Sequence, residues 1–96
     1  MGLFSSKGNE LNVPKAACGE SAAYECVRIW MVNGAPAFSL EDMKETDDPR
    51  AWGSVLADLS AYASSLGNRS GEYPNKQALA EIQEMFNHLV DHWLQD

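Results

Sequence analysis

Two histidines near the C-terminus come closest, by residue type and spacing, to a metal site. His88 and His92 lie four residues apart, and Glu84 extends the same row by one turn. Imidazole nitrogens and carboxylate oxygens bind Zn²⁺, and a four-residue step places such groups on one side of a helix. The glutamate that directly follows the first histidine in H-E-x-x-H zinc enzymes is absent. A metal-binding protein using Glu84, His88 and His92 is therefore the alternative function, set against a solvated helix surface.

The sequence contains no pattern of a catalytic nucleophile or of a phosphate-binding loop. G-x-S-x-G, G-x-G-x-x-G and Walker motifs are all missing. Cys26 would act as a nucleophile only if the fold brought a histidine beside it. Cys18 and Cys26 lie eight residues apart, which matches no zinc motif, so we interpret both as reduced thiols. We predict no enzyme and no cofactor.

Charge and hydropathy limit the partners that this chain can have. Its 14 Asp and Glu outnumber its 7 Lys and Arg, for a net charge of −7, so we expect no nucleic-acid partner. The acidic stretch 41–48 holds Lys44 and no glycine, which argues against a calcium loop. No apolar run approaches the roughly 20 residues of a membrane span, and no secretory signal opens the chain. The first six residues fit an N-myristoylation pattern at Gly2, but no polybasic patch follows, so we expect a cytoplasmic protein without a membrane partner.

The elements that would position these side chains begin with a β-hairpin. Residues 25–32 alternate as in a strand, and Asn33 and Gly34 suit the two positive-φ positions of a type I′ turn. The chain can return as a strand over 37–41, with Pro36 at a strand start or an edge. With a turn of two or of four residues, the two faces are the same. One face carries Val27, Ile29, Met31, Phe38 and Leu40, and the other carries Arg28, Trp30, Ala37, Ser39 and Glu41.

Two amphipathic helices are expected after the hairpin. Asp48 suits the N-cap of the first helix, with Pro49 at its first position and Gly67 after its end. The second helix starts near Pro74 or Asn75. The apolar stripes comprise Trp52, Val55, Leu56, Leu59, Tyr62, Ala63 and Leu66 in the first helix and Leu79, Ile82, Phe86, Leu89, Val90 and Trp93 in the second. We predict an α+β fold in ββαα order, in which two antiparallel helices pack on the hairpin face that carries Val27, Ile29 and Met31. This fold is compatible with a short additional N-terminal strand.

The open face of the hairpin is the predicted functional surface. Residues 1–20 are expected to form a flexible arm and 21–96 a single small domain. A two-stranded sheet is marginal alone, and Trp and Arg are favoured in interface cores. We therefore predict a non-enzymatic interaction module that forms a homodimer through a face containing Arg28, Trp30, Ser39 and Glu41. In the alternative, the arm covers this face, with Leu11 and Val13 packed on Trp30.

Several short motifs follow one another in an informative order. They are Leu11-x-Val13-Pro14-x-Ala16, Glu25-x-x-Arg28-x-Trp30, Ser39-Leu40, the run Asp48-Pro49-Arg50-Ala51-Trp52-Gly53 with Leu56-Ala57-Asp58, and Ile82, Phe86 and Trp93. From Asn9 to Trp93 the chain resembles a family of short, mostly alphaproteobacterial proteins classed as a domain of unknown function. The resemblance implies no activity, cofactor or ligand. It directs attention to Asp48, Pro49, Trp52, Gly53 and Asp58.

Two of these family-motif residues suggest contacts. Gly53 lowers helix stability, so we expect it to permit the close approach of a strand or of a partner. Asp58 lies beside the apolar stripe, where it would meet Arg28 or a backbone donor.

Overall fold

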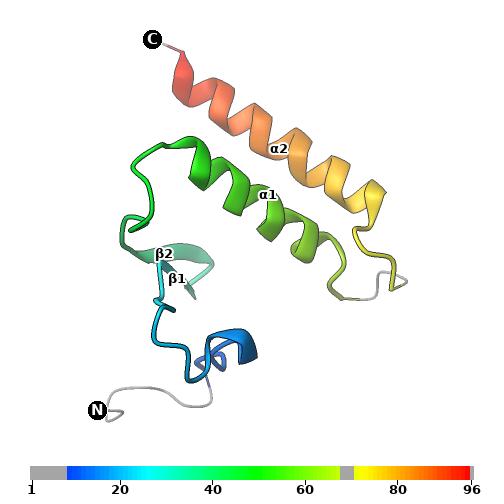
Figure 1. Ribbon diagram of the computed structural model, residues 1–96. Coiled ribbons are helices and arrows are strands. Elements are labelled where there is room, and N and C mark those ends of the chain that lie inside the picture. Colours follow the sequence, from blue (N-terminus) through cyan, green and yellow to red (C-terminus); the bar gives the residue numbers. More distant parts are fainter. Residues whose placement is uncertain (1–8, 68–70, 96) are drawn as a thin grey trace. The chain divides into compact units, whose positions relative to one another are not determined.

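The computed structural model describes residues 9–67 and 71–95, in which a hairpin precedes two helices (Figure 1). The elements are a short 3-10 helix η2 (Lys15–Ala17), strands β1 (Val27–Val32) and β2 (Ala35–Leu40), and helices α1 (Arg50–Ser64) and α2 (Lys76–Leu94). The predicted α+β class and the order β1-β2-α1-α2 are confirmed. Where the sequence left room for an N-terminal strand, residues 9–26 contain only the 3-10 turn.

The chain divides into two compact units, residues 1–44 and 45–96. The first contains the hairpin and the second contains both helices. The predicted packing of the helices on the hairpin joins the two units and stays a prediction, as does the division into an arm 1–20 and a domain 21–96.

The hairpin has the predicted turn and pairing. Asn33 and Gly34 have φ values of 51° and 82°, the left-handed pair that a two-residue type I′ turn needs. The strands are antiparallel, and Val32 pairs with Ala35 next to the turn. β2 therefore begins two residues earlier than expected and contains Pro36, opposite Met31. Proline is tolerated there because β2 is an edge strand of a two-stranded sheet.

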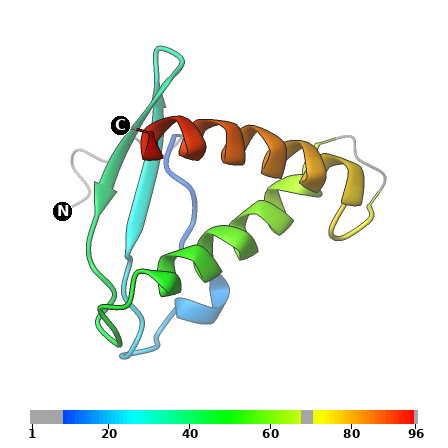
Figure 2. The ribbon, with the colours of Figure 1, turned by 90° about the horizontal axis from the view of Figure 1, so that it is seen from above.

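The second unit is a pair of helices that run in opposite directions and contact each other (Figure 2). α1 is capped by Asp48, whose Oδ1 accepts a hydrogen bond from the backbone N–H of Arg50 (2.9 Å). α2 is capped by Asn75, whose side-chain oxygen accepts from the N–H of Ala78 (3.0 Å). Gly67, with φ of 76°, follows the end of α1. The starts of both helices and the end of α1 thus follow from capping residues in the sequence.

A serine hydroxyl joins the two helices at their loop end. Ser64 is fully buried, and its Oγ donates to the carbonyl of Ala61 (2.6 Å) and accepts from the N–H of Asn75 (3.1 Å). The rings of Tyr62 and Tyr73 lie beside this junction, with their centroids 5.3 Å apart. Because the Asn75 N–H belongs to the cap of α2, this one hydroxyl fixes where the second helix starts relative to the end of the first.

We expect Ser64→Ala to destabilise the helix pair by about 1–2 kcal/mol, because a partly buried backbone donor loses its acceptor. Urea unfolding at a fixed protein concentration measures this change. Ser60→Ala is the matched control: its hydroxyl donates only to the Leu56 carbonyl within α1 (2.9 Å) and bridges nothing between the helices. Equal losses for the two variants would show that the bridge to Asn75 contributes no stability.

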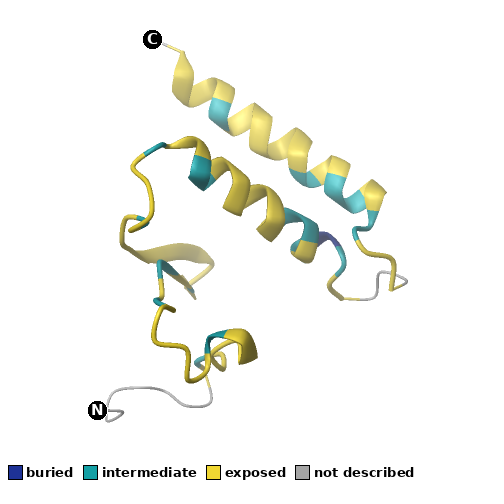
Figure 3. Cartoon of the chain, viewed as in Figure 1, coloured by how far each residue is buried: buried dark blue, intermediate teal, exposed yellow. Residues whose placement is uncertain are grey.

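Hydrophobic side chains remain largely accessible in the described part of the chain, where none is buried (Figure 3). On the hairpin, Ile29, Met31 and Phe38 are exposed by 48%, 65% and 64%. On the helices, the predicted apolar stripes are also exposed over much of their length. The exposed members are Val55, Leu56, Leu59, Tyr62, Leu66, Phe86, Leu89 and Trp93. No helix in the described ranges is both long and apolar enough to cross a membrane.

Candidate functional site

The register of the hairpin places the four predicted interface residues on one face. Arg28 lies opposite Ser39, and Trp30 lies opposite Ala37. The N–H of Glu41 donates to the carbonyl of Cys26 (3.0 Å), which continues the pairing by one more step. Because side chains alternate along a strand, Arg28, Trp30, Ser39 and Glu41 share this face, here called the Arg28 face. Their role in an interface stays a prediction.

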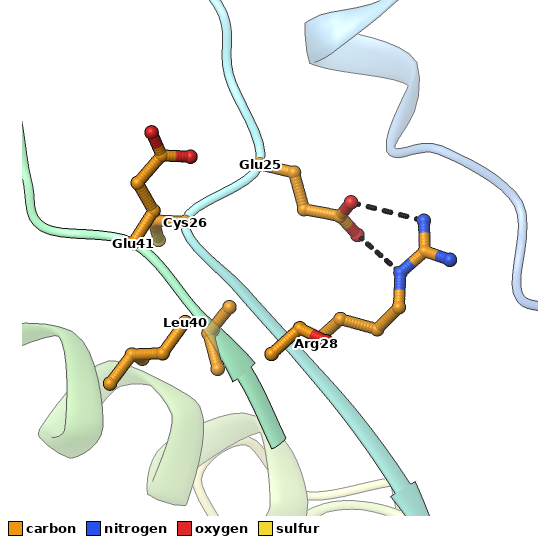
Figure 4. Close-up of a pocket in the computed structure, with 7 residues that line it drawn as sticks. Glu25, Cys26, Arg28, Leu40 and Glu41 are labelled. Atoms are coloured by element: carbon orange, nitrogen blue, oxygen red, sulfur yellow. Dashed lines mark hydrogen bonds and ion pairs between the residues drawn. The ribbon is translucent and has the colours of Figure 1, made fainter.

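Arg28 is the electrostatic centre of this face. Its Nε and Nη2 donate to the two carboxylate oxygens of Glu25 (3.2 and 3.0 Å; Figure 4). Its Nη1 lies 2.8 Å from Oε2 of Glu10. The hydrogen bonds and charge of Glu25, followed by the charge of Glu10, raise the pKa of the Arg28 guanidinium above its ordinary value. Two carboxylates thus hold a permanent cation on β1.

A shallow hollow lies at the open end of the hairpin, beside this cation (Figure 4). Its lining residues are Glu25, Cys26, Val27, Arg28, Ser39, Leu40 and Glu41. The Cys26 thiol is partly exposed, but no histidine belongs to this lining. A cysteine nucleophile needs a base beside it, so the arrangement gives no support to nucleophilic chemistry at Cys26.

The N-terminal segment reaches the Arg28 face through charge. Glu10 forms the 2.8 Å ion pair with Arg28. Leu11 and Val13 are exposed by 91% and 64%, which leaves little of their surface for the alternative in which they pack on Trp30. The alternation of polar and apolar residues in this segment is too short to predict which of its side chains faces the sheet. The acylation signal at Gly2 lies outside the described residues.

The proposed metal ligands do not form a metal site. Glu84, His88 and His92 are all exposed on α2, and no group of three His, Cys, Asp or Glu in the described ranges could hold an ion. The physical reason is the helical rise. Positions 84 and 92 are separated by about 12 Å along the helix axis, so the outer two side chains do not converge on one ion. The three side chains lie on one side of α2, but they are too far apart along the helix to bind one ion together.

The motif around the start of α1 has a structural explanation for its first residues. Both carboxylate oxygens of Asp48 accept hydrogen bonds from the guanidinium of Arg50 (2.9–3.2 Å), in addition to the backbone bond described above. These bonds from Arg50 lower the pKa of Asp48. The carbonyl of Pro49 accepts from the N–H of Trp52 (3.1 Å), and Pro49 has helical φ and ψ. Asp48 and Pro49 thus start the helix.

Two other residues of this motif have no such explanation within the chain. Within its own helical unit, a Cβ at Gly53 would meet nothing within 4 Å. The predicted close approach of a strand or of a partner stays a prediction. Asp58 is exposed on α1. Its predicted pairing with Arg28 would join the two units and stays a prediction, while Arg28 already pairs with two carboxylates of its own unit.

Some contacts at the hairpin were missed from the sequence. Glu25 lies three residues before Arg28, a spacing that could have suggested an ion pair, whereas Glu10 carries no such signal. The hydroxyl of Tyr24 accepts a hydrogen bond from the N–H of Lys44 (3.0 Å), and the Lys44 Nζ lies 4.6 Å from the centre of the same ring. This contact closes the hairpin unit, because the segment entering β1 meets the segment leaving β2.

The fold and this face define a small α+β protein with a charged and aromatic sheet face. The chain belongs to the family described as a domain of unknown function (DUF5076), whose model matches residues 10–93. The resemblance found from the motifs is thereby confirmed. This chain is similar to a solved structure from the photosynthetic bacterium Rhodopseudomonas palustrus CGA009, which is described as a candidate pyruvate dehydrogenase. The two are 26% identical, with a TM-score of 0.68 over 91% of this chain and 88% of that chain. Comparison with curated proteins gives no match.

Proposed function

We propose that this protein is a non-enzymatic interaction module that forms a homodimer through its β-hairpin. The observation that carries the proposal is the two-stranded sheet, one face of which carries Arg28, Trp30, Ser39 and Glu41. Burial of apolar surface is the main favourable term in folding, and a two-stranded sheet is marginally stable alone. A second copy that adds its own strands to this sheet therefore stabilises it.

Charge favours the hairpin as the place where two copies meet. Each copy carries a net charge of −7, so two copies repel each other over most of their surface. β1 has the sequence VRIWMV, in which the single charged residue is the cation Arg28. The other five residues of β1 carry no charge, and the cation is paired with Glu25 and Glu10, so the strand itself adds little to the repulsion between two copies. Nucleic acid and anionic membranes, by contrast, would be repelled by the chain as a whole.

The surroundings of two candidate nucleophiles, Ser64 and Cys26, support a non-enzymatic role. The Ser64 hydroxyl is committed to Ala61 and Asn75, and the lining around Cys26 contains no histidine. The dehydrogenase description belongs to the similar structure and names an activity for which this chain shows no motif. We also propose that this acidic module works in the cytoplasm.

The native mass tests the proposal. Size-exclusion chromatography with light scattering should give about 21 kDa, twice the 10.6 kDa of the chain. The dimer should persist or tighten from low to molar salt, because salt screens the repulsion between the two acidic copies and leaves apolar contacts intact. A particle near 10.6 kDa at every concentration would refute homodimerisation.

A further inference from the structure

The backbone of β1 has a free edge. The bond from the Glu41 N–H to the Cys26 carbonyl makes these two a hydrogen-bonded pair, and such pairs alternate with non-hydrogen-bonded pairs along an antiparallel ladder. The even-numbered residues of β1 therefore direct their N–H and C=O groups to β2. Val27, Ile29 and Met31 direct theirs away from it. In the described ranges, β2 is the one strand paired with β1.

The outer edges of β1 and β2 differ in one backbone N–H group. The outward residues of β2 are Pro36, Phe38 and Leu40, the partners of Met31, Ile29 and Val27. Proline has no N–H, so the β2 edge lacks a donor near its start. The β1 edge has every donor and acceptor in place. It is therefore the edge that can accept another strand over its full length.

We propose that β1 pairs antiparallel with β1 of a second copy, around a two-fold axis at Ile29, to form a four-stranded sheet. This inference rests on the proposed homodimerisation and specifies its geometry. Ile29 faces the partner's Ile29, and Val27 faces the partner's Met31. About six ladder hydrogen bonds form, two for each opposed pair of outward residues. The unpaired edge is thereby removed, and the apolar faces of both hairpins join into one.

Charge selects this register from its neighbours. A two-fold axis at Arg28 would place two arginines directly opposite each other, and like charges at opposed positions destabilise a sheet. An axis at Trp30 would leave Val27 beyond the paired segment. With the axis at Ile29, Arg28 lies directly opposite the partner's Trp30, and the same pair forms twice.

An arginine opposite a tryptophan is a complementary pair. The guanidinium is planar and stacks on an aromatic face while its N–H groups donate in the plane to carboxylates. Arg28 already donates to Glu25 and lies beside Glu10, so these two carboxylates hold its orientation within the hairpin. Trp30 is half-buried at the neighbouring position of the same face. The Arg28 face thus contributes specificity to a contact whose hydrogen bonds come from the strand edge.

Proline scanning of the two edges tests this geometry. Ile29 and Phe38 are directly opposed residues, and neither donates its N–H within the hairpin. Ile29→Pro should raise the dimer Kd by about 100-fold or more, because the donors at the axis are lost. Phe38→Pro, on the outer edge of β2, should leave the Kd within about threefold. Circular dichroism of each variant shows whether the hairpin is retained.

Disulfide trapping gives a second measurement that does not depend on proline being tolerated. In a Cys18→Ser, Cys26→Ser background, Ile29→Cys should cross-link the two copies when the protein is oxidised with diamide, because opposed Cα atoms lie about 5.5 Å apart. Phe38→Cys is the matched control and should remain monomeric on a denaturing gel. Trapping through Phe38→Cys, or through neither, in a protein that is a dimer by mass would overturn the β1 edge and keep homodimerisation. A wild-type protein that is monomeric by mass would overturn both.

Discussion

Replacing Trp30 by alanine is expected to weaken the dimer at least about 30-fold, or about 2 kcal/mol, the effect of an interface residue that dominates binding. Trp30 is the largest side chain on the Arg28 face, and it is the proposed partner of the second copy's Arg28. Truncation removes the aromatic surface in both halves of a symmetric interface. Concentration-dependent light scattering or analytical ultracentrifugation gives the Kd of both proteins.

The control for this prediction is an exposed tryptophan outside the hairpin. Trp93 lies on α2 and is 72% exposed, so Trp93→Ala removes the same surface outside the hairpin. Its Kd should match that of the wild type. A Trp30→Phe variant, which keeps an aromatic face, should recover part of the affinity. Equal weakening by Trp30→Ala and Trp93→Ala would place the contact on the helices or show a general loss of folding.

The sequence was most informative where local chemistry decides the backbone. Asn33 and Gly34 accept positive φ more readily than other residues, so the turn and hence the register followed from two residues. Asp48 and Asn75 have side-chain acceptors that satisfy free N–H groups at helix starts, and both do so in the structure. These signals act over a few residues and do not depend on the rest of the fold.

Contacts between distant residues could not be read in the same way. The partner of Arg28 at position 10 lies 18 residues away, and no periodicity connects the two. The Ser64 hydroxyl looks like any helix-end serine until the loop brings the Asn75 N–H beside it. The row formed by Glu84, His88 and His92 shows the opposite error. Helical phase placed the three on one side, but the rise per residue kept the outer two apart.

The turn glycine gives the second large effect that we expect. Gly34→Ala places a Cβ in a residue with φ of 82°, which costs about 1–2 kcal/mol for an L-residue. A Cβ there would meet nothing within 4 Å, so the cost is that of the backbone alone. A two-stranded sheet is marginal alone, so we expect each hairpin to fold fully only as the dimer forms, and the strain then enters dimer formation twice, about 2–4 kcal/mol. The Kd should therefore rise about 30- to 1,000-fold.

The matched control for the turn is Gly67→Ala. Gly67 has φ of 76° and equally open surroundings, but it follows α1 and belongs to the helical unit. Both variants bear a similar backbone strain, and urea unfolding should show a loss for each. At a protein concentration where the wild type has the mass of a dimer, Gly34→Ala should have a lower mass. Gly67→Ala should keep the mass of a dimer. If Gly67→Ala dissociated the dimer and Gly34→Ala did not, the helical unit would be the interface, because strain in a hairpin that makes no contact with the partner cannot alter the Kd.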